Sequence, residues 1–130
     1  MADGIEARLI QAEAALHGVA TGQGSWLDQL NALRATAITP ALPALTDPGT
    51  PDARVDLLFQ ERASWLFLTG HRQGDLRRLV RNYHRQQDQV YPTGPYAGST
   101  LVDYGADVTA PVPIAESVNP LFHGCLSRGA

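Results

Sequence analysis

The sequence predicts a mostly α-helical domain of helical hairpins, followed by an irregular C-terminal tail rich in Pro and Gly. Two observations carry this prediction. Apolar residues recur at helical spacing in four segments before residue 87, and prolines and glycines interrupt the chain repeatedly from about residue 90. The length of 130 residues fits one domain, and 44% hydrophobic residues is ordinary for a chain that buries a core. We therefore expect a single region over 1–130, helical over 3–86 with a covering tail over 87–130.

The first two helices are expected over 3–17 and 25–37. In the first, apolar residues at i, i+4, i+7 and i+11 begin with Ile5 and form one stripe. Ser25 is suited to cap the second helix with its hydroxyl oxygen, and Asp28 complements the positive end of that helix. The glycine-containing link between the helices is short, which predicts a helical hairpin.

A proline-rich loop over 39–51 separates this hairpin from two more helices. Thr50 followed by proline is typical of a helix start, and it predicts a third helix over 51–69 that ends at Gly70. A fourth helix is expected over 72–86. Helix pairs with these lengths and links resemble tetratricopeptide-type hairpins, so stacked hairpins are the expected architecture.

The tail is expected to be irregular, with one short extended piece at Val112–Ile114. Trp26 and Trp65 lie on the apolar stripes of their helices, so both are expected in the core. The tail tyrosines have two interpretations, either a platform on which a sugar stacks or anchors that hold the tail in place. These tyrosines are Tyr91, Tyr96 and Tyr104.

Six charged residues gather around the expected junction of the third and fourth helices, and we call them the charged cluster. They are Glu61, Arg62, His71, Arg72, Asp75 and Arg78. One hypothesis is catalytic, with His71 as base, Asp75 orienting it and Arg72 holding an anion. The other is an ion-pair network that fixes the angle between two helices. We predict the structural network, with no catalytic residue and no cofactor, because no nucleophile motif or glycine-rich phosphate loop accompanies the cluster.

Metal binding and nucleic-acid binding are not predicted. The four histidines share no metal-like spacing, and the single cysteine, Cys125, permits no disulfide within the chain. Residues 72–85 hold five arginines and one acid. Such a stripe fits either a phosphate-binding helix or a solvated helix face. The net charge of −3 and the scarcity of interleaved aromatic residues favour the solvated face.

The residues of the charged cluster also carry a resemblance. The run from Glu61-Arg62 through Gly70-His71-Arg72 to Asp75-Leu76-Arg77-Arg78 resembles a pattern near the C-terminal end of SusD/RagB-type outer-membrane nutrient-binding proteins. Three further segments of the chain are similar to segments of this family, and together with this run they occur in the family's order. They are Ala12-Glu13-Ala14, Leu30-Asn31-Ala32-Leu33-Arg34 and the tail segment Pro111–Pro120. The chain departs from the pattern at Trp65, Thr69 and Gln73, where the family often has acids or an aromatic residue.

The resemblance implies a non-enzymatic protein that captures glycans or other nutrients at the cell surface. Such proteins pass their ligand to a TonB-dependent, SusC-like transporter in the outer membrane. Family members are longer and begin with a lipoprotein signal, whereas the start of this chain lacks the layout of a signal peptide or lipid anchor.

The matching part is therefore C-terminal, and the residues that bind ligand stay unassigned. A chain that lacks the preceding helices is expected to self-associate through the faces those helices would cover. The alternative function is a small helical scaffold that binds a protein partner.

Overall fold

The computed structural model describes residues 4–20, 22–96, 98, 103–105, 108 and 114–122. Its helices are α1 (Gly4–Leu16), α2 (Trp26–Thr36), α3 (Pro51–Trp65), α4 (Arg72–Arg81), α5 (Gln87–Val90) and α6 (Ile114–Ser117). The chain divides into two compact units, Met1–His71 and Arg72–Ala130. The described residues are mostly helical, which confirms the predicted all-α character.

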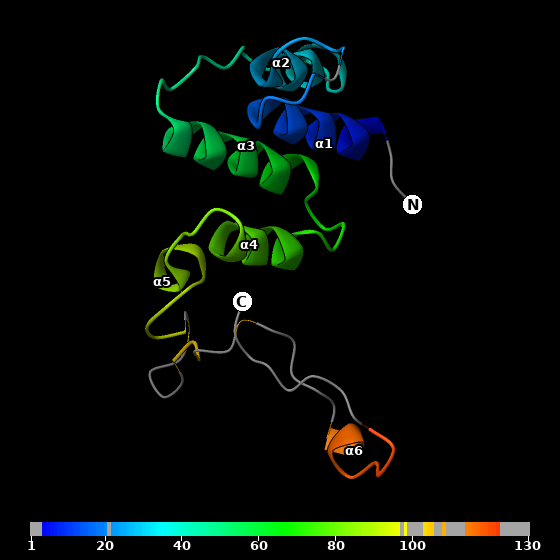
Figure 1. The fold of residues 1–130 in the computed structure, drawn as a ribbon, viewed down its shortest axis with the longest axis vertical. Coiled ribbons are helices and arrows are strands. Elements are labelled where there is room, and N and C mark those ends of the chain that lie inside the picture. Colours follow the sequence, from blue (N-terminus) through cyan, green and yellow to red (C-terminus); the bar gives the residue numbers. More distant parts are fainter. Residues whose placement is uncertain are drawn as a thin grey trace. The chain divides into compact units, whose positions relative to one another are not determined.

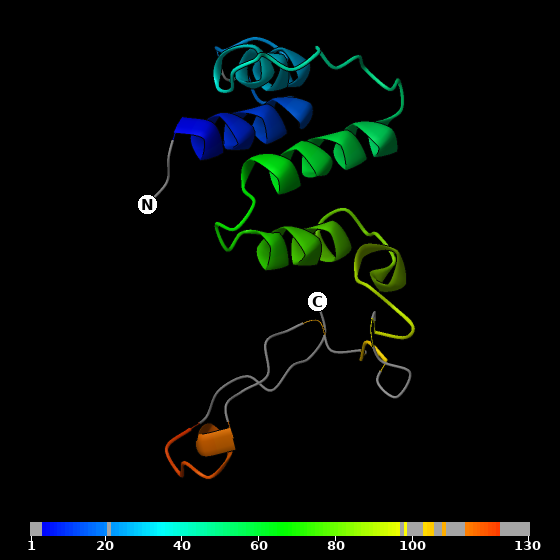
Figure 2. The ribbon, with the colours of Figure 1, turned by 180° about the vertical axis from the view of Figure 1, so that it is seen from behind.

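The first unit is built around α1, which lies between α2 and α3 (Figures 1 and 2). Its core is formed by apolar side chains from all three helices and from the turn after α3. These are Leu9, Ala12, Trp26, Leu30, Leu33, Leu58 and Leu66. The prediction of a core position is confirmed for Trp26, which is 8% exposed, whereas Trp65 is partly buried and packs against the core from its edge.

The predicted helix starts of α2 and α3 are confirmed by their caps. The Ser25 hydroxyl oxygen accepts from the N–H of Asp28, and the Asp28 carboxylate accepts from the N–H of Ser25. This reciprocal pair satisfies two N–H groups that a helix start otherwise leaves open. The Thr50 hydroxyl oxygen accepts from the N–H of Ala53, with proline at the first helical position.

Two predicted helix ends are wrong by several residues. Helix α3 ends at Trp65 rather than at residue 69, and the chain then turns through Leu68, whose φ of 61° is left-handed. Helix α4 ends at Arg81 rather than at residue 86, with the left-handed turn at His84 (φ 56°). In both places a non-glycine residue adopts the conformation that commonly ends helices at glycine, and apolar spacing alone does not indicate such an ending.

The second unit begins with α4, against which α5 packs. The tail contains the short helices α5 and α6 and an isolated antiparallel bridge between Pro95 and Asp103, so it is less irregular than predicted. Tyr96 and Tyr104 meet edge to face, with ring centroids 5.3 Å apart. Val112 and Pro113 lie outside the described residues, and Ile114 begins α6 rather than belonging to an extended piece.

Candidate functional site

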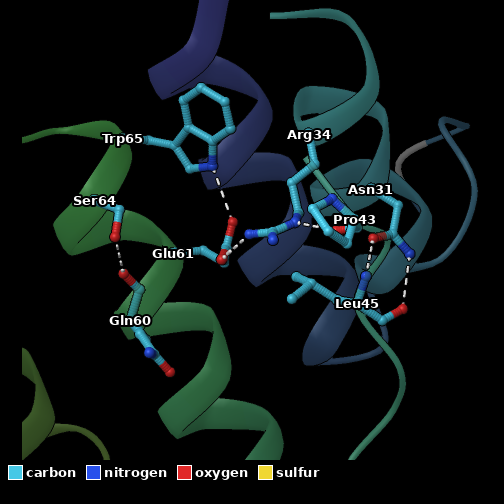
Figure 3. A network of polar contacts seen from close by, with 8 residues as sticks. All are labelled: Asn31, Arg34, Pro43, Leu45, Gln60, Glu61, Ser64 and Trp65. Atoms are coloured by element: carbon cyan, nitrogen blue, oxygen red, sulfur yellow. Dashed lines mark hydrogen bonds and ion pairs between the residues drawn. The ribbon is translucent and has the colours of Figure 1, made fainter. Parts of the chain in front are cut away.

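Glu61 is the centre of a polar network in the first unit (Figure 3). Glu61 is a buried residue of α3, at 6% exposure. One carboxylate oxygen accepts from Arg34 Nη1 of α2 at 2.8 Å, and the other accepts from Trp65 Nε1 at 3.0 Å. Trp65 follows Glu61 by four residues, so both side chains lie on one face of α3. The network therefore links α2 to α3 through a charge pair that is largely removed from water.

The same network fixes the proline-rich loop before α3. Arg34 Nε donates to the carbonyl oxygen of Pro43 at 2.7 Å. Asn31 donates to the carbonyl oxygen of Leu45 at 3.1 Å and accepts from the Leu45 N–H at 2.7 Å. Asn31 and Arg34 are three residues apart, so both project from one side of α2 (Figure 3). Side chains of α2 thus satisfy three backbone groups of the loop, namely the carbonyl oxygens of Pro43 and Leu45 and the N–H of Leu45.

Arg62 joins α3 to α1. It is 4% exposed, and its Nη1 lies 4.0 Å from Glu13 Oε2. Its guanidinium carbon also lies 6.0 Å from the centre of the Phe59 ring, within the range of a cation–π contact. A buried guanidinium is tolerated where a carboxylate and an aromatic face surround it.

His71 connects the end of the first unit back to its beginning. Its Nε2 lies 2.9 Å from Glu6 Oε1 of α1, and its Nδ1 lies 2.7 Å from the Thr69 hydroxyl. Thr69 in turn donates to the carbonyl oxygen of Leu66 at 2.5 Å, so its oxygen is left to accept from the ring.

The remaining members of the charged cluster lie in the second unit. Asp75 is 4% exposed and accepts from Arg78 Nη1 at 3.1 Å on the same helix. Arg72 is exposed, and no ion pair of Arg72 is found within the described part of the chain. Glu61, Arg62 and His71 thus have partners within the first unit, and Asp75 and Arg78 contact each other within the second. Burial of Arg72 is not observed.

Sequence analysis did not identify the residues that Glu61, Arg62 and His71 contact on α1 and α2. Arg34 pairs with Glu61 across 27 residues, Glu13 approaches Arg62, and Glu6 binds His71 across 65 residues. One sequence signal pointed toward Arg34: it shares a helix face with Asn31 within the segment Leu30–Arg34, which carries part of the resemblance. Spacing on one helix cannot choose a partner on another.

The described part of the chain shows neither a metal-like cluster nor a membrane helix. No group of three or more His, Cys, Asp or Glu side chains in this part is placed to hold a metal ion. Among the described residues, none of the helices combines the length and apolar character that crossing a bilayer requires. Comparison with protein-family models, curated proteins and solved structures found no match to this chain.

Proposed function

We propose that this chain is the C-terminal helical part of a SusD/RagB-type protein. It contributes to capture of a glycan or other nutrient at the cell surface, and the ligand then passes to a TonB-dependent, SusC-like transporter in the outer membrane. The observation that carries this proposal is the order of four motif-like segments along the chain, from Ala12-Glu13-Ala14 to the tail segment Pro111–Pro120.

The contacts of the motif residues support a binding protein rather than an enzyme. Asn31 and Arg34 of the second segment hold the proline-rich loop, and Arg34 also binds Glu61. Arg62 and His71 approach carboxylates of α1. Each acidic or basic group in these contacts is engaged in linking one part of the unit to another. We infer that these segments form a rigid support, while the ligand is contacted elsewhere in the complete protein.

The proposal includes the finer architecture. The helices form tetratricopeptide-like stacked hairpins, the C-terminal tail covers them, and preceding hairpins pack on the exposed side of the first unit. Ile10 of α1 is 53% exposed and Val19 in the following turn is 57% exposed, as expected of positions that another helix covers in a longer protein.

The test begins with the gene and ends with the complete protein. The DNA upstream of Met1 is expected to encode, in frame, a lipoprotein signal and further helices, with a transporter gene alongside. The complete product should co-purify with that transporter from detergent-extracted membranes. It should also bind an oligosaccharide that the present chain does not bind. A monomeric present chain with micromolar affinity for a neutral oligosaccharide would overturn the proposal, as would a complete protein that leaves the transporter unbound.

The alternative function, a scaffold for a protein partner, is favoured by one observation. Phe67 and Leu68 are adjacent on the turn after α3 and are 73% and 89% exposed. Exposed neighbouring apolar side chains often mark a protein contact. In that case replacement of both by Ser would abolish binding of the partner, and the chain would not co-purify with a transporter.

A further inference from the structure

Two arginines of α4 form a basic pair that the charged cluster does not include. Arg77 and Arg81 are four residues apart, so their side chains are neighbours on one face of the helix. Arg81 is exposed and Arg77 is half-buried. Arg78 differs from both because it pairs with Asp75. Within the described part of the chain, neither Arg77 nor Arg81 forms an ion pair with an acid.

Tyr91 lies beside this pair. It directly follows α5, which packs against α4, and the charges of both arginines act on its phenol group. Its hydroxyl oxygen is buried and has no hydrogen-bond partner in the part of the chain that the structure describes. A buried hydroxyl without a partner is unfavourable, and most such groups in folded proteins are hydrogen-bonded.

The side chains of Arg77, Arg81 and Tyr91 can all donate hydrogen bonds. A guanidinium offers only donors, and a neutral phenol offers one. Burial raises the pKa of the Tyr91 hydroxyl, against the opposing effect of Arg77 and Arg81, so the group keeps its hydrogen at neutral pH. None of these three side chains carries a negative charge at neutral pH, so together they suit an anionic acceptor.

We propose that Arg77, Arg81 and Tyr91 form a binding site for a small oxyanion, a carboxylate or a sulfate group. Both anions match the fork of donors that guanidinium groups present. The Tyr91 oxygen is buried in the free protein, so neighbouring side chains rotate before the anion reaches it. Binding is therefore weak, with a dissociation constant of about 1 mM.

A short anion fits these residues better than a polynucleotide. Nucleic-acid binding draws on contacts to several phosphates, whereas one helical turn here provides two guanidiniums that have no acid partner in the described part of the chain. The net charge of the chain is −3, which opposes a long polyanion. The anion has two possible sources, a free inorganic ion or the carboxylate of an acidic sugar. The second source rests on the proposed function, and the first does not.

The test uses nuclear magnetic resonance on the full chain labelled with ¹⁵N. Sodium sulfate is titrated first, then trigalacturonate, and sodium chloride at matched ionic strength is the reference. The expected result is a saturable shift of the Arg77 and Arg81 side-chain Nε–H signals and of the Tyr91 amide signal. Shifts that grow linearly and equally in chloride would overturn the site.

Variants separate this site from general electrostatics. Arg81→Gln and Tyr91→Phe are each expected to weaken sulfate binding about tenfold, the loss expected for a hydrogen bond to a charged group. Arg72→Gln is the matched control, because Arg72 is an exposed arginine that lies about 140–180° around the same helix from the pair. It should change the affinity by less than about twofold. Equal losses in Arg72→Gln and Arg81→Gln would contradict the proposal.

Tyr91→Phe distinguishes a binding role of the hydroxyl from a structural role, because the two roles predict different changes in thermal stability and anion affinity. Its hydroxyl has no described partner in the free protein, so its removal should leave the thermal unfolding midpoint unchanged or higher while anion binding weakens. A lower midpoint with unchanged binding would assign the hydroxyl to the fold and overturn its place in the site.

The two ligands separate the site from the proposed function. If sulfate binds saturably and trigalacturonate does not bind, the result supports the oxyanion site and assigns it to small ions. Binding of both supports an acidic sugar as the source. A single-stranded oligonucleotide that binds more tightly than trigalacturonate, with affinity falling steeply in salt, would overturn the choice of a short anion. Absence of sulfate binding would sink the site and leave the proposed transporter association standing.

Discussion

Replacement of Glu61 by Leu should strongly destabilise the first unit. The change removes the acceptor of Arg34 Nη1, whose side chain is 17% exposed, and the acceptor of the Trp65 indole N–H. Loss of one partner of a buried ion pair costs about 3–5 kcal/mol, and the residual exposure of Arg34 places this case near about 3 kcal/mol. For a domain of this size that loss lowers the thermal midpoint by roughly 12–24 °C.

The assay is urea unfolding followed by Trp fluorescence, with a double-mutant cycle. Arg34→Met should also be destabilising, and the double variant should recover part of the loss, because it leaves no buried charge unpaired. Gln60→Ala is the control, since Gln60 is the exposed neighbour of Glu61 on α3 and its side chain has no part in the drawn contacts of Figure 3. A Glu61→Leu loss below about 1 kcal/mol, or losses that simply add, would refute the reasoning.

Three further outcomes are expected. Trp26 and Trp65 should show blue-shifted fluorescence that acrylamide quenches poorly, and free quenching of both would place them on the surface rather than against the core. Hydrogen bonds from the Ser25 side chain and backbone lower the pKa of Asp28 below 3.8. The stability they contribute is complete above about pH 4 and is lost as the pH falls through the lowered value, so wild-type melting should fall more steeply below pH 4 than that of Asp28→Asn. The isolated chain should self-associate in light scattering, and Ile10→Glu, which charges a 53% exposed apolar position, should reduce this; a monomer at all concentrations would contradict the idea of an uncovered face.

The fold was predictable where the signal is local. The start of α2 was predicted from Ser25 and Asp28, whose reciprocal hydrogen bonds lie within one turn. The end of α3 was not, because the apolar residues after Trp65 continue a helical pattern while the backbone turns at Leu68. Leu66 is buried although it follows the helix. A hydrophobic stripe reports which residues are buried, and it does not report where the backbone hydrogen bonds stop.

The candidate site was predictable in some of its members and not in its pairing. The buried, paired state of Glu61 and Asp75 fits the predicted structural role. Arg34 could not be chosen as the partner of Glu61 over other arginines, because its position depends on how α2 packs beside α3. Tyr91 was noted as a tail tyrosine, but its place beside the arginines of α4 follows from the packing of α5, a helix too short to predict from periodicity.

The double hydrogen bond between Asn31 and Leu45 has a consequence for the kinetics of amide exchange. Leu45 lies in a segment without helix or strand, where backbone amides ordinarily exchange with deuterium as fast as in an unfolded chain. Its N–H is bonded to Asn31 Oδ1 at 2.7 Å, and its side chain packs against the core. That amide can exchange only when the loop lifts off α2, so its protection factor measures the free energy of this local opening separately from global unfolding. One loop amide thus reports how firmly α2 holds the segment that leads into α3.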